Sequence, residues 1–146
     1  MEINDILVPI DFSAASLKSL EYALSMVAPE GEIYLLHVLD TDFVEKVQDN
    51  ELGTAETVKE KLRGRAEHGL DEIINEHANV STKLNKMIVV GIPFIEILRI
   101  ANDLDFSLIV MGIGGKKNNP LKGIFFGSTV DRVLRATHIP IFCVPL

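Results

Sequence analysis

The sequence predicts an α/β fold, in which one open, parallel sheet of five strands carries helices on both faces. Three observations lead to this prediction. Short, wholly apolar runs, which are typical of strands covered on both sides, recur along the chain. Stretches with apolar residues at helical spacing separate these runs, and serine, proline and glycine residues lie where the stretches begin or end. Strands and helices that alternate in this way form mostly parallel sheets.

The first half of the chain opens with a strand and a helix. The apolar run from Ile6 to Ile10 predicts the strand, and Ser13 is a residue type that favours the N-cap of a helix. The helix has leucines at helical spacing and ends before Pro29. The remaining elements of this half are a buried strand at 33–39, a polar segment at 40–53 that we expect to be a loop or a poorly ordered helix, and a long helix at 55–78.

The second half opens with a partly polar strand. Lys83, Asn85 and Lys86 lie in its first part, and lysines are common where a strand forms the edge of a sheet. Pro93 suits the first position of the helix that follows. The elements expected in this half are strands at 82–90, 107–111 and 141–145, and helices at 93–104 and 128–136. With 146 residues and no internal repeat, we expect residues 1–146 to form one domain.

A loop rich in glycine and lysine is the segment most suggestive of a function. The apolar strand breaks at Gly112, and the loop closes at Gly127, Ser128 and Thr129, where a helix begins. Glycine lets the backbone approach an anion closely, and the first N–H groups of a helix have no partner within it. The loop also carries Lys116, Lys117 and Lys122 and no acidic residue, in a chain of net charge −7. The pattern predicts a polyphosphate site, although lysines can also merely keep a loop soluble and glycines merely form turns.

The strand order follows from the position of this site. Ligands of open α/β sheets bind beyond the carboxyl ends of the strands. Two turns there carry suitable side chains, at Asp11–Ser13 after the first strand and at Gly112–Gly115 after the fourth. If both contact one ligand, the first and fourth strands are neighbours, and right-handed crossovers then favour the order 3-2-1-4-5.

That order leaves the last strand at an edge of the sheet. Its residues Ile141, Phe142, Cys143 and Val144 carry no charge, and an uncharged apolar edge needs a partner. We therefore expect a homodimer in which two copies of this strand pair across a two-fold axis. The alternative is that Leu146 and the end of the chain cover the edge.

Composition argues against several classes of function. The net charge of −7 and a pI near 5 argue against a general nucleic-acid binder and a binder of anionic membranes. No apolar run approaches a membrane span, and the first residues lack the pattern of a secretion signal. The single cysteine, Cys143, fits a reducing cytoplasm and leaves no usual zinc motif. We expect a cytoplasmic protein with no nucleic-acid or membrane partner, and we interpret its four histidines as structural.

Familiar nucleotide and catalytic motifs do not match. The Walker pattern fails because Lys117, not serine or threonine, follows Lys116, and position 110 is valine. The Rossmann glycine pattern needs a third glycine where Lys117 stands, which makes dinucleotide oxidoreduction an unsuitable assignment. No nucleophile elbow or paired cysteine and histidine supports covalent catalysis, so no catalytic residue is predicted.

Four segments along the chain have the character of family signatures: Ile6–Ser13, Leu36–Val38, Gly91–Pro93 with Ile97 and Leu98, and Val110–Gly115 followed by Gly127 and Ser128. Through these segments the chain resembles the universal stress protein family over essentially its whole length. The last resembles the ATP-binding version of the family motif, G-x2-G-x9-G-[ST]. Here eleven residues, 116–126, stand where that pattern has nine. The two extra residues fit at the turn-forming Asn118-Asn119-Pro120. They affect the expected contacts to the β- and γ-phosphates more than the contacts to adenosine, because the phosphate contacts depend on the path of the loop.

The resemblance implies a Rossmann-like fold and a role for each matching residue. Asp11 would accept from the adenine or ribose, and Pro9 and Val38 would flank the base. Met111 and Gly112 would lie against the ribose and α-phosphate. Gly115, Gly127, Ser128 and Thr129 would hold the phosphates, with Ser13, Lys116, Lys117 and Lys122 as further candidates near them. ATP, or AMP or ADP, would be the ligand, and magnesium or manganese could accompany its phosphates.

Three functions are compatible with these observations. The first is a cytoplasmic, homodimeric stress-response protein that binds an adenine nucleotide as a switch or protective module. The second is a slow ATPase or a phosphotransferase, in which positioning and charge stabilisation alone would act. The third is a dimeric interaction protein that binds no nucleotide because the longer loop fills the site.

Overall fold

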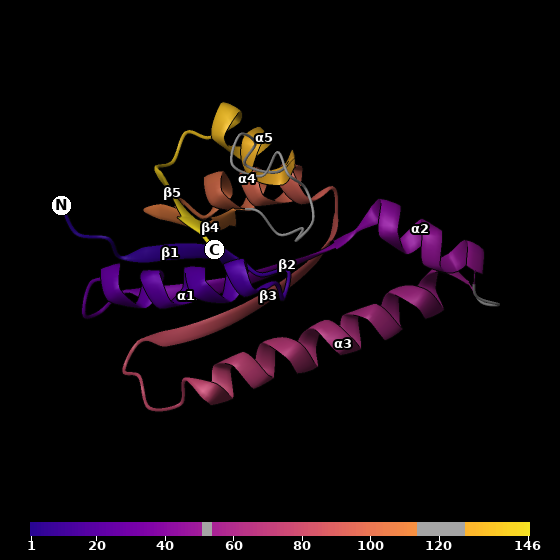
Figure 1. The fold of residues 1–146 in the computed structure, drawn as a ribbon, viewed down its shortest axis with the longest axis horizontal. Helices are drawn as coiled ribbons and strands as arrows, with labels where there is room; N and C mark the ends of the chain where they lie inside the picture. The colour runs from indigo at the N-terminus through magenta and orange to yellow at the C-terminus, as the bar shows by residue number, and fades with distance from the viewer. Residues whose placement is uncertain (51–53, 114–127) are drawn as a thin grey trace.

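Five parallel strands form one sheet at the centre of the structure, in the predicted order β3-β2-β1-β4-β5 (Figure 1). The computed structural model describes residues 1–50, 54–113 and 128–146. The strands are β1 (Asp5–Pro9), β2 (Glu32–Asp40), β3 (Lys83–Gly91), β4 (Leu108–Ile113) and β5 (Ile141–Pro145). The helices are α1 (Ala14–Met26), α2 (Thr41–Asn50), α3 (Ala55–Glu76), α4 (Pro93–Asp103) and α5 (Ser128–Ala136). The predicted fold class is confirmed.

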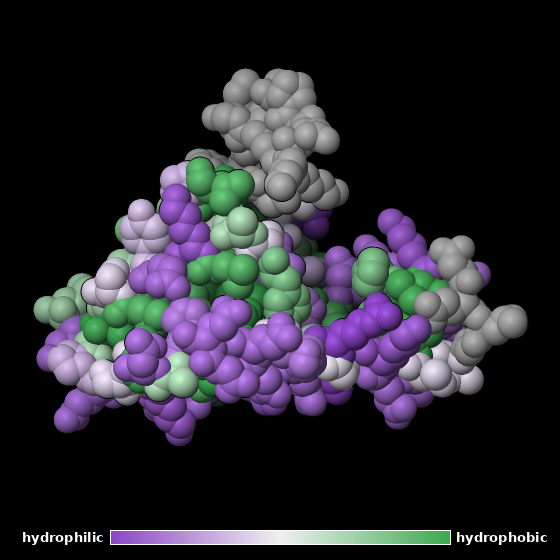
Figure 2. Space-filling model, turned by 60° about the horizontal axis from the view of Figure 1, so that its bottom comes forward, coloured by the Kyte–Doolittle hydropathy of each residue, from purple (hydrophilic) through white to green (hydrophobic). Residues whose placement is uncertain are grey.

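Helices cover both faces of the sheet because successive strand side chains point to opposite faces. On β1, Ile6 and Val8 belong to the apolar core that α1 and α3 cover. Leu7, between them, belongs to the core that α4 and α5 cover. A strand buried on both faces needs apolar residues at every position, which is why the wholly apolar runs predicted these strands. The outer side of α3 is largely hydrophilic (Figure 2).

The structure corrects the expectation for residues 40–53, because residues 41–50 form the regular helix α2. The Asp40 carboxylate accepts a hydrogen bond from the Asp42 N–H at 3.0 Å and so caps the start of this helix. Val44 is buried against Leu39 and against Val58 of α3, in a third apolar cluster. Only a narrow side of α2 is therefore apolar, and tertiary packing stabilises a helix whose composition is mostly polar.

Two element boundaries matter for the site. Ser13 is the N-cap of α1, as predicted, and its hydroxyl accepts a hydrogen bond from the Ser16 N–H at 3.2 Å. The predicted break at Gly112 is wrong, because β4 continues to Ile113 and Gly112 pairs with Val144 of β5. Gly112 is therefore a strand residue next to the first turn of α1, not a loop residue.

The polar residues of β3 lie at the edge of the sheet, as predicted, and ion pairs hold its two lysines. The Lys86 Nζ atom lies 2.8 Å from Asp71 Oδ1 of α3, and the Lys83 Nζ atom lies 3.5 Å from Glu32 Oε1 of β2. Hydrogen bonding to Asp71 raises the pKa of Lys86, so this lysine stays charged at the edge. Charges of this kind discourage pairing with another strand.

A histidine joins the ends of two helices on the α1 and α3 face. The His77 Nδ1–H donates to the Ile73 carbonyl at 2.7 Å, and Nε2 lies 2.8 Å from Glu21 Oε1 of α1. Both acceptors are satisfied only by the doubly protonated ring. The hydrogen bond to Glu21 is the main cause that raises the pKa of His77; burial opposes it, and the Ile73 carbonyl and nearby carboxylates add to it.

We expect this contact to stabilise the protein more at low pH than at high pH. Because folding raises the pKa of His77, the stabilisation is complete below the unfolded value near 6.5 and is lost as pH rises through the raised value. Glu21→Gln should lower the free energy of unfolding by about 0.5–1 kcal/mol at pH 6 and by less at pH 8.5 in urea titrations. Glu72→Gln, which breaks the exposed His68–Glu72 pair, is the matched control with little effect. Equal losses at both pH values would contradict the assignment.

Candidate functional site

The turn after β1 and the end of β4 meet at one rim of the sheet, as predicted, because these two strands are neighbours. A cavity of about 410 Å³ opens between them, a size typical of small-molecule sites. The predicted residues that line it are Pro9, Asp11, Ser13, Val38, Met111, Gly112 and Thr129. Ser128 begins α5 but is exposed and is not among the lining residues. The predicted Gly115, Lys116, Lys117, Lys122 and Gly127 lie outside the described residues.

A tight turn presents the Asp11 carboxylate at the mouth of the cavity. The Ser13 N–H donates to Asp11 Oδ1 at 2.9 Å. Desolvation alone would raise the pKa of Asp11, but hydrogen bonds from the Ser13 side chain and backbone, aided by Ser16, outweigh it and lower the pKa. Asp11 is therefore ionised at neutral pH, so its free lone pairs can only accept hydrogen bonds from a ligand.

Apolar side chains form the floor and one wall of the cavity. Val38 comes from the end of β2, Met111 from β4, and Ile97 from α4. Met111 and Ile97 are buried in the core that α4 and α5 cover. A slot with such walls suits a flat, apolar group whose polar edges reach the backbone or the rim.

Three helix N-termini open onto the same cavity. Ala15 and Ser16 line it from the first turn of α1, Pro93 from the first turn of α4, and Thr129 from the first turn of α5. No side chain caps α4, whose N-cap residue is Ile92. Because each helix start carries unpaired N–H groups and a partial positive charge, their convergence favours an anion at this rim. The arrangement can thus hold an anionic group beside an apolar slot.

Several lining residues were not predicted from the sequence. Ser16 and Ala15 belong to an ordinary first helical turn, and the sequence indicates for Pro93 only that it suits the first position of a helix. His37 was interpreted as structural, and its Nδ1–H does donate to the Ile10 carbonyl at 2.7 Å, which holds the backbone where β1 ends. Asp40 was overlooked although it ends β2, the neighbour of β1. The available signal was position at a strand end or helix start, not residue type.

Packing alone requires glycine at position 112. A Cβ atom there would lie 2.5 Å from the Ala15 carbonyl carbon and 2.6 Å from its oxygen. The end of β4 therefore contacts the first turn of α1 directly. This contact brings the Ser13 and Ser16 side of the cavity against its Met111 side.

The predicted dimer residues lie on β5, which forms the second edge of the described sheet. Val144 is 0% exposed and belongs to the core beneath α1, so its side chain cannot contact a partner. Phe142 is 38% exposed, and its ring lies 5.6 Å from that of Tyr22. Cys143 is half-buried, and desolvation raises the pKa of its thiol. The pairing of two such edges stays a prediction.

Within 1–50, 54–113 and 128–146, no three histidine, cysteine or acidic side chains are grouped closely enough to hold a metal ion. None of the helices in these ranges combines the length and apolar character that crossing a bilayer requires.

Known proteins share this fold over the whole chain. The universal stress protein MJ0577 of Methanocaldococcus jannaschii is 33% identical over 152 residues, which covers 95% of this chain and 93% of that protein. Its solved structure superposes with a TM-score of 0.85 over 100% of this chain and 98% of the other, at 31% identity.

Two more distant structures share the fold and contain nucleotides. A universal stress protein of Archaeoglobus fulgidus in complex with dAMP has a TM-score of 0.69 at 20% identity and covers 99% of both chains. A universal stress protein in complex with cAMP has a TM-score of 0.62 at 16% identity, and the match covers 99% of this chain and 98% of the other. The sequence profile described as the Universal stress protein family matches residues 2–145. The chain therefore belongs to the universal stress protein family.

Proposed function

We propose that this stress protein binds ATP or another adenine nucleotide in the cavity between the ends of β1 and β4. The observation that carries the proposal is the convergence of three helix N-termini on a cavity that also has an apolar slot and an acceptor-only carboxylate. The helix N-termini suit the anionic phosphates, the apolar slot suits the flat heterocycle, and the carboxylate suits the hydroxyl groups of the sugar. The dAMP and cAMP complexes of distant relatives support the same class of ligand.

Each end of the nucleotide has residues suited to it. The base would lie in the slot against Pro9 and Val38, with Asp11 accepting from the ribose hydroxyls or the adenine amino group. The α-phosphate would lie near Gly112 and Thr129, at the starts of α1 and α5. The further phosphate contacts, from Gly115, Gly127 and Ser128, rest on the family resemblance. Because the described residues offer no cluster of metal ligands, magnesium or manganese would be held chiefly by phosphate oxygens.

We further propose a cytoplasmic homodimer that acts as a nucleotide-dependent switch or protective module. The free edge of β5 supports the dimer, since exposed Phe142 and Tyr22 lie beside it. Cys143 is the only cysteine of the chain and supports a reducing compartment. A nucleotide that spans the starts of α1, α4 and α5 would couple elements from both faces of the sheet.

Calorimetric titration of the purified protein with AMP, ADP and Mg-ATP tests the binding proposal. We expect one saturable site per protomer and a rise in melting temperature, because a ligand at about 100 times its Kd adds roughly 2.7 kcal/mol of stability. Chromatography of the supernatant after heating would identify any nucleotide that survives purification. No heat of binding, no melting shift at millimolar Mg-ATP and no retained nucleotide would together refute the proposal.

Asp11→Asn should weaken the binding of both adenosine and ATP by about tenfold, since a charge-assisted hydrogen bond becomes a neutral one. The matched control is Asp105→Asn, at the opposite end of β4, where the backbone φ of 51° suits asparagine. Calorimetry at pH 7.5 measures both variants. If Asp11 faced the phosphates instead of the sugar or base, its removal would strengthen ATP binding and leave adenosine unchanged, which would contradict the assigned role.

A further inference from the structure

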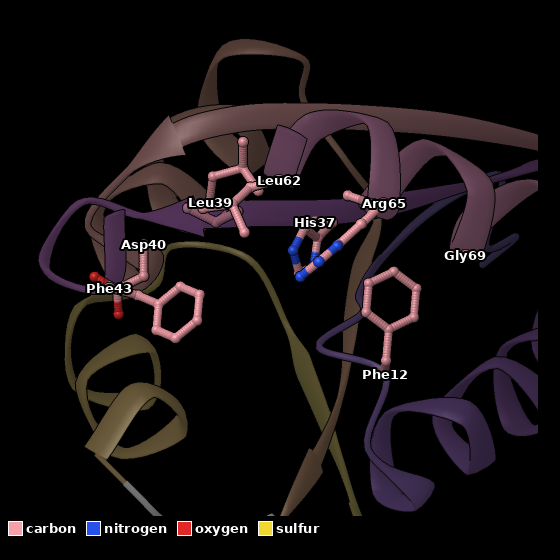
Figure 3. Close-up of a pocket in the computed structure, with 10 residues that line it drawn as sticks. Phe12, His37, Leu39, Asp40, Phe43, Leu62, Arg65 and Gly69 are labelled. Carbon is pink, nitrogen blue, oxygen red and sulfur yellow. The ribbon is translucent and has the colours of Figure 1, made fainter. Parts of the chain in front are cut away.

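A second cavity, of about 470 Å³, lies on the other side of the carboxyl end of β2 (Figure 3). The end of β2, helix α2 and the middle of α3 surround it, and Phe12 closes one side. It shares only His37, Val38 and Asp40 with the lining of the nucleotide cavity, so the end of β2 is a common wall. None of the functions described above uses this second cavity.

Two aromatic rings bound the second cavity. Phe12 is 38% exposed and Phe43 is 54% exposed, and Figure 3 shows their rings on opposite sides of the opening. Phe12 has a φ of 65°, in the left-handed region that a bulky residue rarely adopts. The Phe12 ring lies directly on α3, where a Cβ atom at Gly69 would be 2.7 Å from it. The centroid of the Phe12 ring lies 4.9 Å from that of the His37 ring. Glycine on the helix and an unusual backbone conformation thus place an exposed aromatic face at this opening.

A guanidinium group points into the same space. Figure 3 shows the Arg65 side chain extending from α3 toward His37. It forms no hydrogen bond or ion pair with any residue that the structure describes. Its neighbour Arg63, by contrast, donates to the Ile88 carbonyl at 3.4 Å. An arginine at an apolar cavity, with no partner among the described residues, can offer its planar fork of donors to a carboxylate.

The other polar groups limit what the cavity can accept. The His37 Nδ1–H donates to the Ile10 carbonyl, so Nε2 is the ring nitrogen that is left for a ligand. Asp40, which lies beside Phe43, carries a negative charge and caps α2, so it disfavours a second anion at that end. One cation and one opposing carboxylate suit a ligand with a single negative charge, directed toward Arg65, rather than a polyphosphate.

We propose that this cavity binds a small aromatic carboxylate. The ring of the ligand packs between Phe12 and Phe43 and against Leu62, and its carboxylate pairs with Arg65. Such a molecule matches both the apolar walls and the Arg65 guanidinium, and a volume of about 470 Å³ accommodates one or two fused rings.

The test uses the full chain and two probes of the same shape, 2-naphthoate and the neutral 2-naphthamide. Amide chemical shifts of the ¹⁵N-labelled protein locate each probe, and titration gives its Kd. We expect 2-naphthoate to shift amides at the end of β2 and at Leu62–Gly69. Arg65→Gln should weaken 2-naphthoate by about fivefold or more and leave 2-naphthamide unchanged. The matched control is Arg63→Gln, on the same helix, and should change neither probe.

A second variant separates the ring from the charge. Phe43→Ser, at an exposed position, should weaken both probes equally, because it removes an apolar wall that both contact. Three results would overturn the proposal: no shifts at these residues with millimolar 2-naphthoate, the same affinity in the Arg65 variant as in wild type, or displacement of 2-naphthoate by AMP with shifts confined to Pro9–Ser13 and Gly112. Displacement with those shifts would assign the probe to the nucleotide cavity. AMP binding is measured separately by calorimetry, so the absence of 2-naphthoate binding would not contradict the proposed nucleotide site.

Discussion

Gly112→Ala should lower the free energy of unfolding by about 2 kcal/mol, because the added methyl group has no room beside the first turn of α1. The new Cβ would lie 2.5 Å from the Ala15 carbonyl carbon, and both atoms it meets most closely belong to backbone. The end of β4 or the first turn of α1 must move, and both belong to well-packed elements. Thermal unfolding should show a decrease of about 4–8 °C.

The matched control for this variant is Gly64→Ala, which has the opposite expected sign. Gly64 lies inside α3, and an added Cβ would meet no atom within 4 Å. Because alanine favours a helix over glycine, this substitution should stabilise the protein by about 0.5–1 kcal/mol. If Gly112→Ala were as stable as wild type, α1 could shift freely against the sheet, and the contact would not determine the shape of the cavity.

This prediction also bears on how binding data at Gly112 are interpreted. Moving the first turn of α1 displaces Ser13 and Ser16, which line the nucleotide cavity. A loss of ATP affinity in a Gly112 variant is therefore expected whether or not the glycine contacts the nucleotide. Asp11→Asn, at an exposed turn, provides the cleaner test of a direct contact.

The fold was predictable because burial on both faces leaves a clear pattern in the sequence. The run from Ile6 to Val8 is apolar at each position, and its alternate residues do belong to two different cores. The strand order was predictable because one ligand was assumed to bridge two turns, which required β1 and β4 to be neighbours. Helix α2 was not predictable, since Val44 is buried only through contacts with Leu39 and with α3.

The candidate site was predictable in part for the same reason. Asp11 could be identified because it lies just beyond the end of an apolar run, whereas Met111 was identified only through the family resemblance. Ala15 and Pro93 become lining residues only when helices pack on the sheet, which residue type does not reveal. The second cavity depends on the approach of Phe12 to Gly69, residues that are far apart in sequence, and no local pattern indicates it.

Cys143→Pro should weaken the proposed dimer by about 100-fold, the largest effect on association that we expect. The Ile109 N–H donates to the Pro140 carbonyl at 2.9 Å, so backbone groups of β5 alternate between β4 and the free edge, and those of Ile141 and Cys143 face the free edge. Proline removes the outward N–H while leaving the hydrogen bonds to β4 in place. Across a two-fold axis the loss occurs twice, for a total of about 3 kcal/mol.

Cys143→Val is the matched control, because it keeps the N–H and a small apolar side chain at the same position. Sedimentation velocity across a range of concentrations gives the dimer Kd of each variant, and thermal unfolding verifies that each is folded. A proline variant as dimeric as the valine variant would mean that the chains associate through another surface. The wild-type protein could also stay monomeric when the nucleotide is present at about 100 times its Kd, which saturates the site. That result would favour the alternative, in which Leu146 and the chain end cover the edge of β5.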